Sequence, residues 1–153
     1  LALVHGRPGK MGQLDLPIAR HPVRRKEMSV RREGRDAVTR WERIQSFEIG
    51  FSVLRIEIRT GRTHQIRVHM AHMGWPVVGD AVYGHGKRRW KQHPLFKKGV
   101  LPEAKRQMLH AASLGFHHPA DGRYMAFHAP VPEDMQGVLR ALETAEENGM
   151  CDE

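Results

Sequence analysis

The stretch Arg59-Thr60-Gly61-Arg62-Thr63-His64-Gln65-Ile66-Arg67-Val68-His69-Met70 decides the fold, because strand-like alternation ends in it and helical spacing begins. Residues 51–59 lead into it and alternate between apolar and charged side chains from Leu54 onward, which predicts a strand with one buried face. Thr60 and Gly61 interrupt the alternation. Beyond them, apolar side chains recur at helical spacing, at Ile66, Met70 and Met73. The pattern predicts a strand that leads through a tight turn into the N-terminus of a helix.

The predicted helix begins after Thr63, which we take as its N-cap, and ends at Gly74 and Pro76. The backbone N–H groups at such an N-terminus suit a bound phosphate or carboxylate. Polar and basic side chains surround this N-terminus, namely Arg62, His64, Gln65 and Arg67. From these residues alone, an ordinary strand-to-helix turn with solvated arginines is the alternative interpretation.

Length and composition describe one basic globular domain. The chain has 153 residues, of which 40% are hydrophobic and 27% charged, and this is enough for one core. A formal net charge of +8 and a pI near 10.2 are typical of a protein that binds a polyanion, although a basic protein without a specific partner has the same charge. The single cysteine, Cys151, predicts neither a disulfide framework nor a cysteine-based metal site, and we expect a reducing, cytoplasmic setting. No apolar run has the length of a membrane span.

Two pairs of alternating segments predict antiparallel hairpins. Residues 37–47 precede the strand at 51–59, and their alternation slips near Arg43, where we expect a bulge. Residues 109–117 and 124–129 flank a Pro-Ala-Asp-Gly turn signal and predict the second hairpin.

The remaining segments contain few helix signals. We predict a glycine-rich turn at 6–12, a short connector at 14–18, and an amphipathic helix that begins at Pro132. The predicted buried stripe of that helix consists of Met135, Val138, Leu139 and Leu142. The sequence therefore predicts an α/β fold of the α+β type, with a mixed, largely antiparallel sheet and a few flanking helices.

Two basic segments outside the central stretch are candidate contacts to an RNA backbone. The first is a predicted hairpin with its turn at Glu33-Gly34, and it carries Arg24, Arg25 and Lys26. The second is a predicted long loop at 84–105, in which Lys87, Arg88 and Arg89 precede Trp90. Cations follow phosphates and aromatic rings stack on splayed bases, so this mixture suits RNA. A solvated segment without a ligand is the alternative for each.

Other chemistry-bearing residues are expected to be structural. His64, His69 and His72 do not share one helix face, and no cysteine or acid completes a tetrahedral set, so we expect no metal and rank a metal-dependent hydrolase using His69 and His72 last. Asp80 follows a glycine and is expected to serve a turn rather than catalysis. Trp41 is expected in the core.

The central stretch resembles the signature of the RluA family of RNA pseudouridine synthases. The resemblance is carried by Thr60–His69 with Gly79-Asp80 and Tyr83-Gly84 after it. Further segments follow in family order: Leu1–Gly6, Pro17-Ile18, Arg20–Pro22, Met28, Ala37–Thr39, Leu109–Ala111 and His128–Met135. Within the family, the similarity is greatest to members that modify the large ribosomal subunit. It implies a pseudouridine synthase fold, isomerisation of uridines in RNA, with large-subunit ribosomal RNA as the expected substrate, and no cofactor.

The resemblance also implies that residues 1–153 form the C-terminal portion of a catalytic domain. In the family, the nucleophilic aspartate of a His-Arg-Leu-Asp segment and a tyrosine that stacks on the uracil both lie upstream of the part matched here. Neither is in this sequence, so we expect the chain to be inactive alone. A non-catalytic RNA-binding module is the alternative, and an aspartate and a tyrosine upstream in the complete protein would favour the enzyme.

Site residues follow from the resemblance position by position. Arg67 is expected to pair with the absent aspartate, because a guanidinium stays charged and holds a carboxylate bidentately. Ile66 is expected to form an apolar floor beneath the uracil. The other residues of the motif are expected to hold the phosphate or sugar edge of the target nucleotide: Arg62, Thr63, His64 and Gln65.

Overall fold

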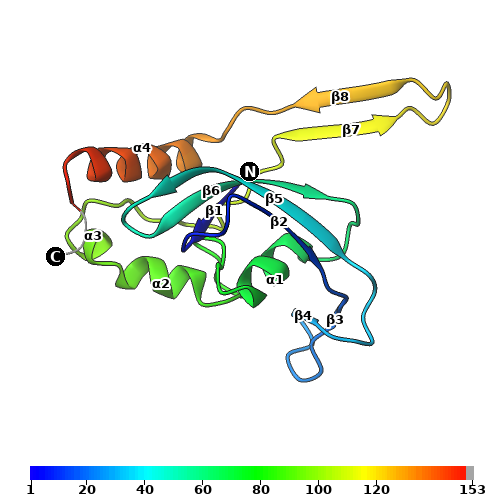
Figure 1. Ribbon diagram of the computed structural model, residues 1–153, viewed down its shortest axis with the longest axis horizontal. Coiled ribbons are helices and arrows are strands. Elements are labelled where there is room, and N and C mark those ends of the chain that lie inside the picture. The colour runs from blue at the N-terminus through cyan, green and yellow to red at the C-terminus, as the bar shows by residue number, and fades with distance from the viewer. Residues whose placement is uncertain (151–153) are drawn as a thin grey trace.

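The computed structural model describes residues 1–150, and Cys151 lies outside this range. Its centre is a four-stranded antiparallel sheet with the strand order β1-β6-β5-β2 (Figure 1). The strands are β1 (Ala2–His5), β2 (Met11–Asp15), β5 (Val38–Phe47) and β6 (Phe51–Ile58). The predicted antiparallel pairing of the two long strands is confirmed, and so is the bulge, which lies between Arg43 and Gln45.

Strand β2 corrects the predicted turn and connector at 6–18. Met11–Asp15 pairs with β5 along its whole length and forms an edge of the sheet. Met11, Gln13 and Asp15 are exposed, and Leu14 alone among the side chains of β2 packs against a core, so the sequence carries no apolar alternation there. Gly12 is required because a Cβ atom at this position would lie 2.1 Å from the ring of Trp41. Trp41 itself is buried, as predicted.

The basic hairpin is also arranged differently from the prediction. Strands β3 (Ile18–Arg20) and β4 (Met28–Val30) pair with each other, so the connecting loop is 21–27 and not the predicted turn at Glu33-Gly34. A turn does occur at that position, where the Gly34 N–H donates to the carbonyl of Arg31. It directs the chain back so that Arg35 bridges to Ile18.

Within residues 1–150, four helices pack around the sheet. They are α1 (Gln65–His72), α2 (Gly86–Gln92), α3 (Pro94–Lys97) and α4 (Glu133–Glu147). The predicted long loop at 84–105 therefore contains α2 and α3. Trp90 is 1% exposed, its ring lies 5.3 Å from that of Phe51, and its indole N–H donates to Pro102, so it packs in the core and is not available to stack on a base.

The sheet is covered on both faces (Figure 1). The larger core joins Leu3 and Val53 of the sheet to Met135 and Leu142 of α4, which confirms the predicted apolar stripe of that helix, with Leu139 half-buried at its edge. The smaller core, on the opposite face, packs Met70 of α1 on neighbouring strands, against Val4, Trp41 and Leu54. Helix α1 is therefore fixed to the sheet by burial of its own apolar side.

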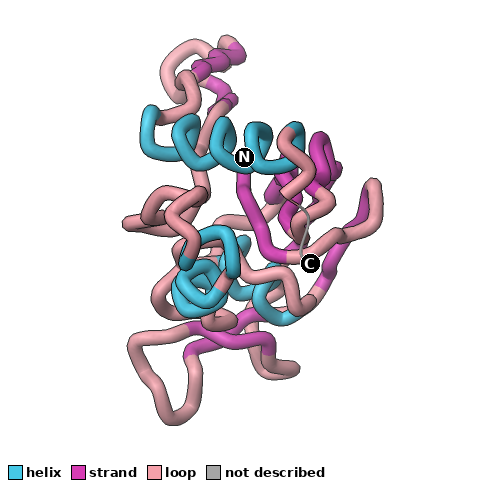
Figure 2. Tube along the Cα trace, turned by 90° about the vertical axis from the view of Figure 1, so that its left-hand side faces the viewer, coloured by secondary structure: helices cyan, strands magenta, loops and turns pink. Residues whose placement is uncertain are grey.

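The second predicted hairpin is confirmed as β7 (Ser113–His117) and β8 (Tyr124–His128), although its first strand begins later than residue 109. Both views show it projecting beyond α4 and outside the packed body (Figures 1 and 2). Leu114 and Phe127 are paired across it and remain more than one-third exposed. Across residues 1–150, no helix is both long and apolar enough to cross a membrane.

Candidate functional site

The predicted strand, turn and helix form the centre of the site. Strand β6 ends at Ile58, and α1 begins at Gln65. The residue before the helix is His64, which has the left-handed backbone conformation with φ of 56° and gives no side-chain cap. The predicted N-cap at Thr63 is therefore wrong. A non-glycine residue in this conformation carries strain, which the surrounding contacts must hold.

Gln65 supplies those contacts from inside the turn. Its amide oxygen accepts from the Thr60 hydroxyl at 2.8 Å and from the Arg62 N–H at 3.1 Å. Its amide nitrogen donates to the Val38 carbonyl at 3.0 Å and the Thr39 hydroxyl at 3.1 Å. Gln65 is 3% exposed, so the prediction that it contacts RNA is corrected: its amide is fully used in tying the turn to β5.

Arg67 points to the segment that follows α1 rather than to solvent. Its Nε donates to Asp80 Oδ2 at 2.7 Å and its Nη2 donates to Asp80 Oδ1 at 2.9 Å. Its guanidinium carbon lies 4.9 Å from the centre of the Tyr83 ring. The two hydrogen bonds to Asp80 and the Tyr83 ring against its face fix the plane of the Arg67 guanidinium.

Asp80 is buried and hydrogen-bonded on both carboxylate oxygens. Besides Arg67, the backbone N–H groups of Val82 and Tyr83 donate to its Oδ1, at 2.9 and 3.0 Å. Burial alone would raise the pKa of Asp80, but the hydrogen bonds from Arg67, Tyr83 and Val82 outweigh it and lower that pKa. The two backbone bonds confirm the predicted turn-forming role of Asp80.

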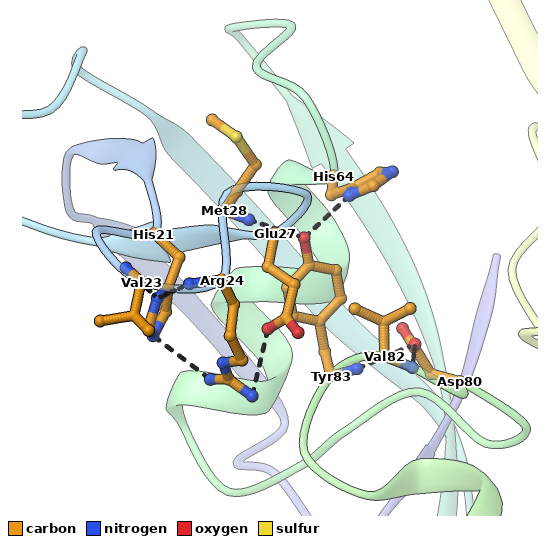
Figure 3. A network of polar contacts seen from close by, with 9 residues as sticks. All are labelled: His21, Val23, Arg24, Glu27, Met28, His64, Asp80, Val82 and Tyr83. Carbon is orange, nitrogen blue, oxygen red and sulfur yellow. Dashed lines mark hydrogen bonds and ion pairs between the residues drawn. The ribbon is translucent and has the colours of Figure 1, made fainter.

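Tyr83 connects the basic hairpin to the motif, as Figure 3 shows. Its hydroxyl oxygen accepts from the Met28 N–H at 2.9 Å and lies 2.8 Å from Nδ1 of His64. The loop beside it is held by Arg24, which forms an ion pair with Glu27 at 3.3 Å. Tyr83 therefore contacts strand β4, His64 and the face of the Arg67 guanidinium.

The charges of this cluster shift the pKa values of its members. Partial burial and the nearby Arg67 charge lower the pKa of His64, so its imidazole is neutral at neutral pH. The hydrogen bonds to Asp80 raise the pKa of Arg67 against the effect of burial. Burial raises the pKa of Tyr83, which keeps its hydroxyl protonated. At neutral pH the cluster therefore holds one cation, Arg67, paired with one anion, Asp80.

The other motif residues lie at the surface around this cluster. Arg62 is half-buried and donates through Nε to the Asp36 carbonyl at 2.9 Å, while Thr63 is exposed. Ile66 is half-buried against the smaller core. An open cavity of about 450 Å³ separates the turn from the β3–β4 hairpin, and its lining includes Arg20 and Arg35 as well as Arg62 and Thr63.

One of the two basic segments precedes the motif in the chain and the other follows it. Arg24, Arg25 and Lys26 are exposed in the loop between β3 and β4. Lys87, Arg88 and Arg89 lie at the start of α2, whose position is coupled to the cluster because the Lys87 N–H donates to the Asp80 carbonyl at 2.9 Å.

The helix histidines have separate surroundings. His69 is fully buried, with Nδ1 2.8 Å from the Thr39 hydroxyl and Nε2 2.9 Å from the Leu16 carbonyl, whereas His72 is exposed. Among residues 1–150, no three histidine, cysteine or acidic side chains gather in a way that could hold a metal ion.

Sequence reasoning missed that Asp80 and Tyr83 contact Arg67. The two partners lie 13 and 16 positions further along the chain, beyond the end of α1, so no local periodicity joins them. The available signal was the carboxylate itself, because a charged residue that follows a buried segment needs a partner.

In sequence, the chain is similar to known RNA pseudouridine synthases. The sequence profile described as RNA pseudouridylate synthase matches residues 1–72. An uncharacterized RNA pseudouridine synthase of Chloroflexus aurantiacus is 46% identical over 93% of this chain and 41% of that protein. The ribosomal large subunit pseudouridine synthase D of Xanthomonas campestris pv. campestris is 45% identical over 93% of this chain and 43% of that protein. The chain thus spans about two-fifths of the length of these relatives.

The fold has a match among solved structures. The human protein described as RNA Pseudouridylate Synthase Domain Containing 1 superimposes with a TM-score of 0.66 and 24% identity, over 93% of this chain and 63% of that chain. This likeness concerns the fold, and the sequence relatives add the family. The chain belongs to the RluA family of RNA pseudouridine synthases.

Proposed function

We propose that the protein containing this chain isomerises uridine to pseudouridine in RNA, with large-subunit ribosomal RNA as its substrate. Residues 1–153 would be the C-terminal portion of the catalytic domain. The observation that carries the proposal is the Arg67 guanidinium, which Asp80 holds through Nε and Nη2 while Nη1 takes part in neither bond. Family membership supplies the reaction to which this cation is assigned.

The reaction explains why a fixed cation is useful. The bond between uracil N1 and the ribose breaks, the freed base turns, and a new bond forms at C5 without net oxidation or reduction. In the proposal, the carboxylate that starts this sequence is contributed by a part of the longer protein outside this chain. Arg67 would keep that carboxylate ionised and aimed through its remaining nitrogen, because a guanidinium stays charged where water is excluded.

RNA binding is assigned to the surface around Arg67. The target base must leave its stack to be reached, so the protein needs cations along the backbone and an apolar wall for the base. Arg62, Thr63 and His64 are proposed to contact the phosphate or sugar, and Ile66 to form the wall. The charges at Arg24–Lys26 and Lys87–Arg89, which are exposed apart from the half-buried Lys87, would contact the RNA backbone further out.

Tritium release from RNA labelled at uracil C5 tests the proposal, because C5 loses its hydrogen only when the new bond forms. The assay compares the full-length protein with residues 1–153 alone, and RNA binding is measured for both. We expect release by the full-length protein only, with binding by both. RNA binding without release by either would favour a non-catalytic RNA-binding module, and would overturn the proposed reaction.

A further inference from the structure

We propose that Asp80 is a positioning residue that aims Arg67 in the pseudouridine synthase site. This inference rests on the proposed function and adds a residue to it. The two groups meet edge to edge, with bonds of 2.7 and 2.9 Å between the guanidinium and the carboxylate. Such a pair fixes the direction of the guanidinium as well as its charge.

The pair leaves one nitrogen for chemistry. Asp80 occupies Nε and Nη2 of Arg67, and the Tyr83 ring lies 4.9 Å from the guanidinium carbon. The Arg67 side chain is 12% exposed, so little of it reaches the surface. Nη1 is the nitrogen with which Arg67 can meet a reacting carboxylate, and rotation toward any other edge would break the bonds to Asp80.

The Asp80 carboxylate is itself fixed in position by its hydrogen bonds, which leave it no contact with a substrate. Its side chain is 0% exposed, and the N–H groups of Val82 and Tyr83 donate to it in addition to Arg67. Gly79 makes this turn possible, because its φ is 75° and a Cβ atom there would lie 2.1 Å from the Arg106 carbonyl oxygen. A buried carboxylate with both oxygens engaged cannot reach a sugar or a base. Asp80 therefore acts through Arg67.

The role predicts a specific kinetic defect. Without the Asp80 anion, Arg67 can rotate and can hold the reacting carboxylate through its Nε and Nη2 edge, in the wrong direction for reaction. Since the RNA-contacting cations are elsewhere, RNA affinity is preserved. A loss that appears in kcat and not in binding is the sign of an interaction needed in the reaction.

The experiment uses the full-length protein with Asp80→Asn, which keeps the shape and removes the charge. The matched control is Asp134→Asn, because Asp134 makes an equivalent bidentate pair with Arg106, at 2.7 and 2.8 Å, on the exposed start of α4. We expect kcat for tritium release to fall at least about 30-fold in Asp80→Asn, with RNA Kd within about twofold. Asp134→Asn is expected to change neither value by more than about twofold.

A double-variant cycle separates positioning from general destabilisation. If Asp80 acts through Arg67, adding Asp80→Asn to Arg67→Lys lowers kcat by less than about threefold beyond Arg67→Lys alone. Asp80→Glu keeps the charge and moves the carboxylate, and it is used in the same way if Asp80→Asn does not fold. We expect it also to lower kcat by at least about tenfold.

The outcomes distinguish the two proposals. An active wild-type protein with unchanged kcat in Asp80→Asn, or in Asp80→Glu where that replaces it, would overturn the role of Asp80 alone. Multiplicative losses in the double variant would also overturn it, since they would mean that Asp80 does not act through Arg67. A full-length wild-type protein that binds RNA but releases no tritium would overturn the proposed function, and the role of Asp80 with it.

Discussion

At the residue scale, the buried side chain of Gln65 ties the turn before α1 to strand β5. Its amide makes four hydrogen bonds, to the turn on one side and to β5 on the other. Gln65→Ala leaves buried donors and acceptors without partners, so we expect the free energy of unfolding to fall by about 2 to 3 kcal/mol. Urea denaturation measures this change.

The matched control for that substitution is Gln92→Ala, at an exposed position on α2. A surface change of this kind is expected to alter the free energy of unfolding by less than about 0.5 kcal/mol. Equal effects of the two substitutions would mean that the amide network contributes nothing to stability.

The roles of Arg67, Gln65 and Asp80 could be predicted from the sequence to different extents. The stretch from Thr60 to His69 marks where the site lies, and Asp80 was correctly given a turn. Gln65 was misassigned because a polar residue at a helix start is as suited to hold its own turn as to hold a ligand. The Arg67–Asp80 pair depends on where the chain returns after α1, which no local pattern encodes.

At the element scale, the loop between β3 and β4 is the clearest test of RNA contact outside the motif. Arg25 and Lys26 are exposed in it, whereas Arg24 is paired with Glu27. In the full-length protein, Arg25→Ser with Lys26→Ser is expected to weaken RNA binding and to reduce the slope of log K against log salt by about 1.5, since two phosphate contacts are lost. Titrations at several salt concentrations measure the slope.

Lys97→Ser with Lys98→Ser provides the control for the loop variant. These lysines are exposed at the end of α3, which lies at the opposite end of the body from the β3–β4 hairpin (Figure 1). Each double variant removes two positive charges, so the net charge of the protein changes equally in the control and in the loop variant. A slope reduced equally by both variants would contradict a specific contact by the loop.

The elements themselves were predictable where one face is buried. Strand β5 alternates up to the bulge after Arg43, and β6 alternates in sequence from Leu54 onward, although both of its faces are buried over residues 51–54. Strand β2 was missed because its apolar residues, Met11 and Leu14, are three positions apart, so this edge strand shows no alternation. Helices α2 and α3 were missed because basic composition and bounding glycines resemble a loop, while the burial of Trp90 depends on Phe51, far away in the sequence.

At the scale of the whole molecule, buried neutral histidines make the fold sensitive to acid. Burial, assisted by the charges of Arg89 and His93 and opposed by the hydrogen bond to the Gly86 carbonyl, lowers the pKa of His5 to about 4 from an ordinary value of 6.5. Burial likewise lowers the pKa of His69. The unfolded chain binds these protons at a higher pH than the folded chain does. The contribution of the two neutral histidines to the free energy of unfolding is therefore fully present above pH 6.5 and is lost as the pH falls toward 4.

His5 alone accounts for a loss of roughly 3 kcal/mol across this pH range. We expect His5→Gln to reduce the difference between the free energies of unfolding at pH 6.5 and pH 4.5, as measured by denaturant titration at each pH. The same difference in the variant and the wild type would contradict the buried, neutral state of His5.

The most direct test of the role assigned to Arg67 is turnover by the full-length protein with Arg67→Ala, measured together with its affinity for RNA. We expect tritium release to fall at least about 1,000-fold while RNA Kd stays within about threefold. The control is Arg106→Ala, which removes the arginine that pairs bidentately with Asp134. It is expected to keep wild-type turnover. Arg67→Lys keeps a cation beside Asp80 and takes the place of Arg67→Ala if the latter does not fold. Wild-type turnover in the Arg67 variant would contradict the assignment of this arginine to the reaction.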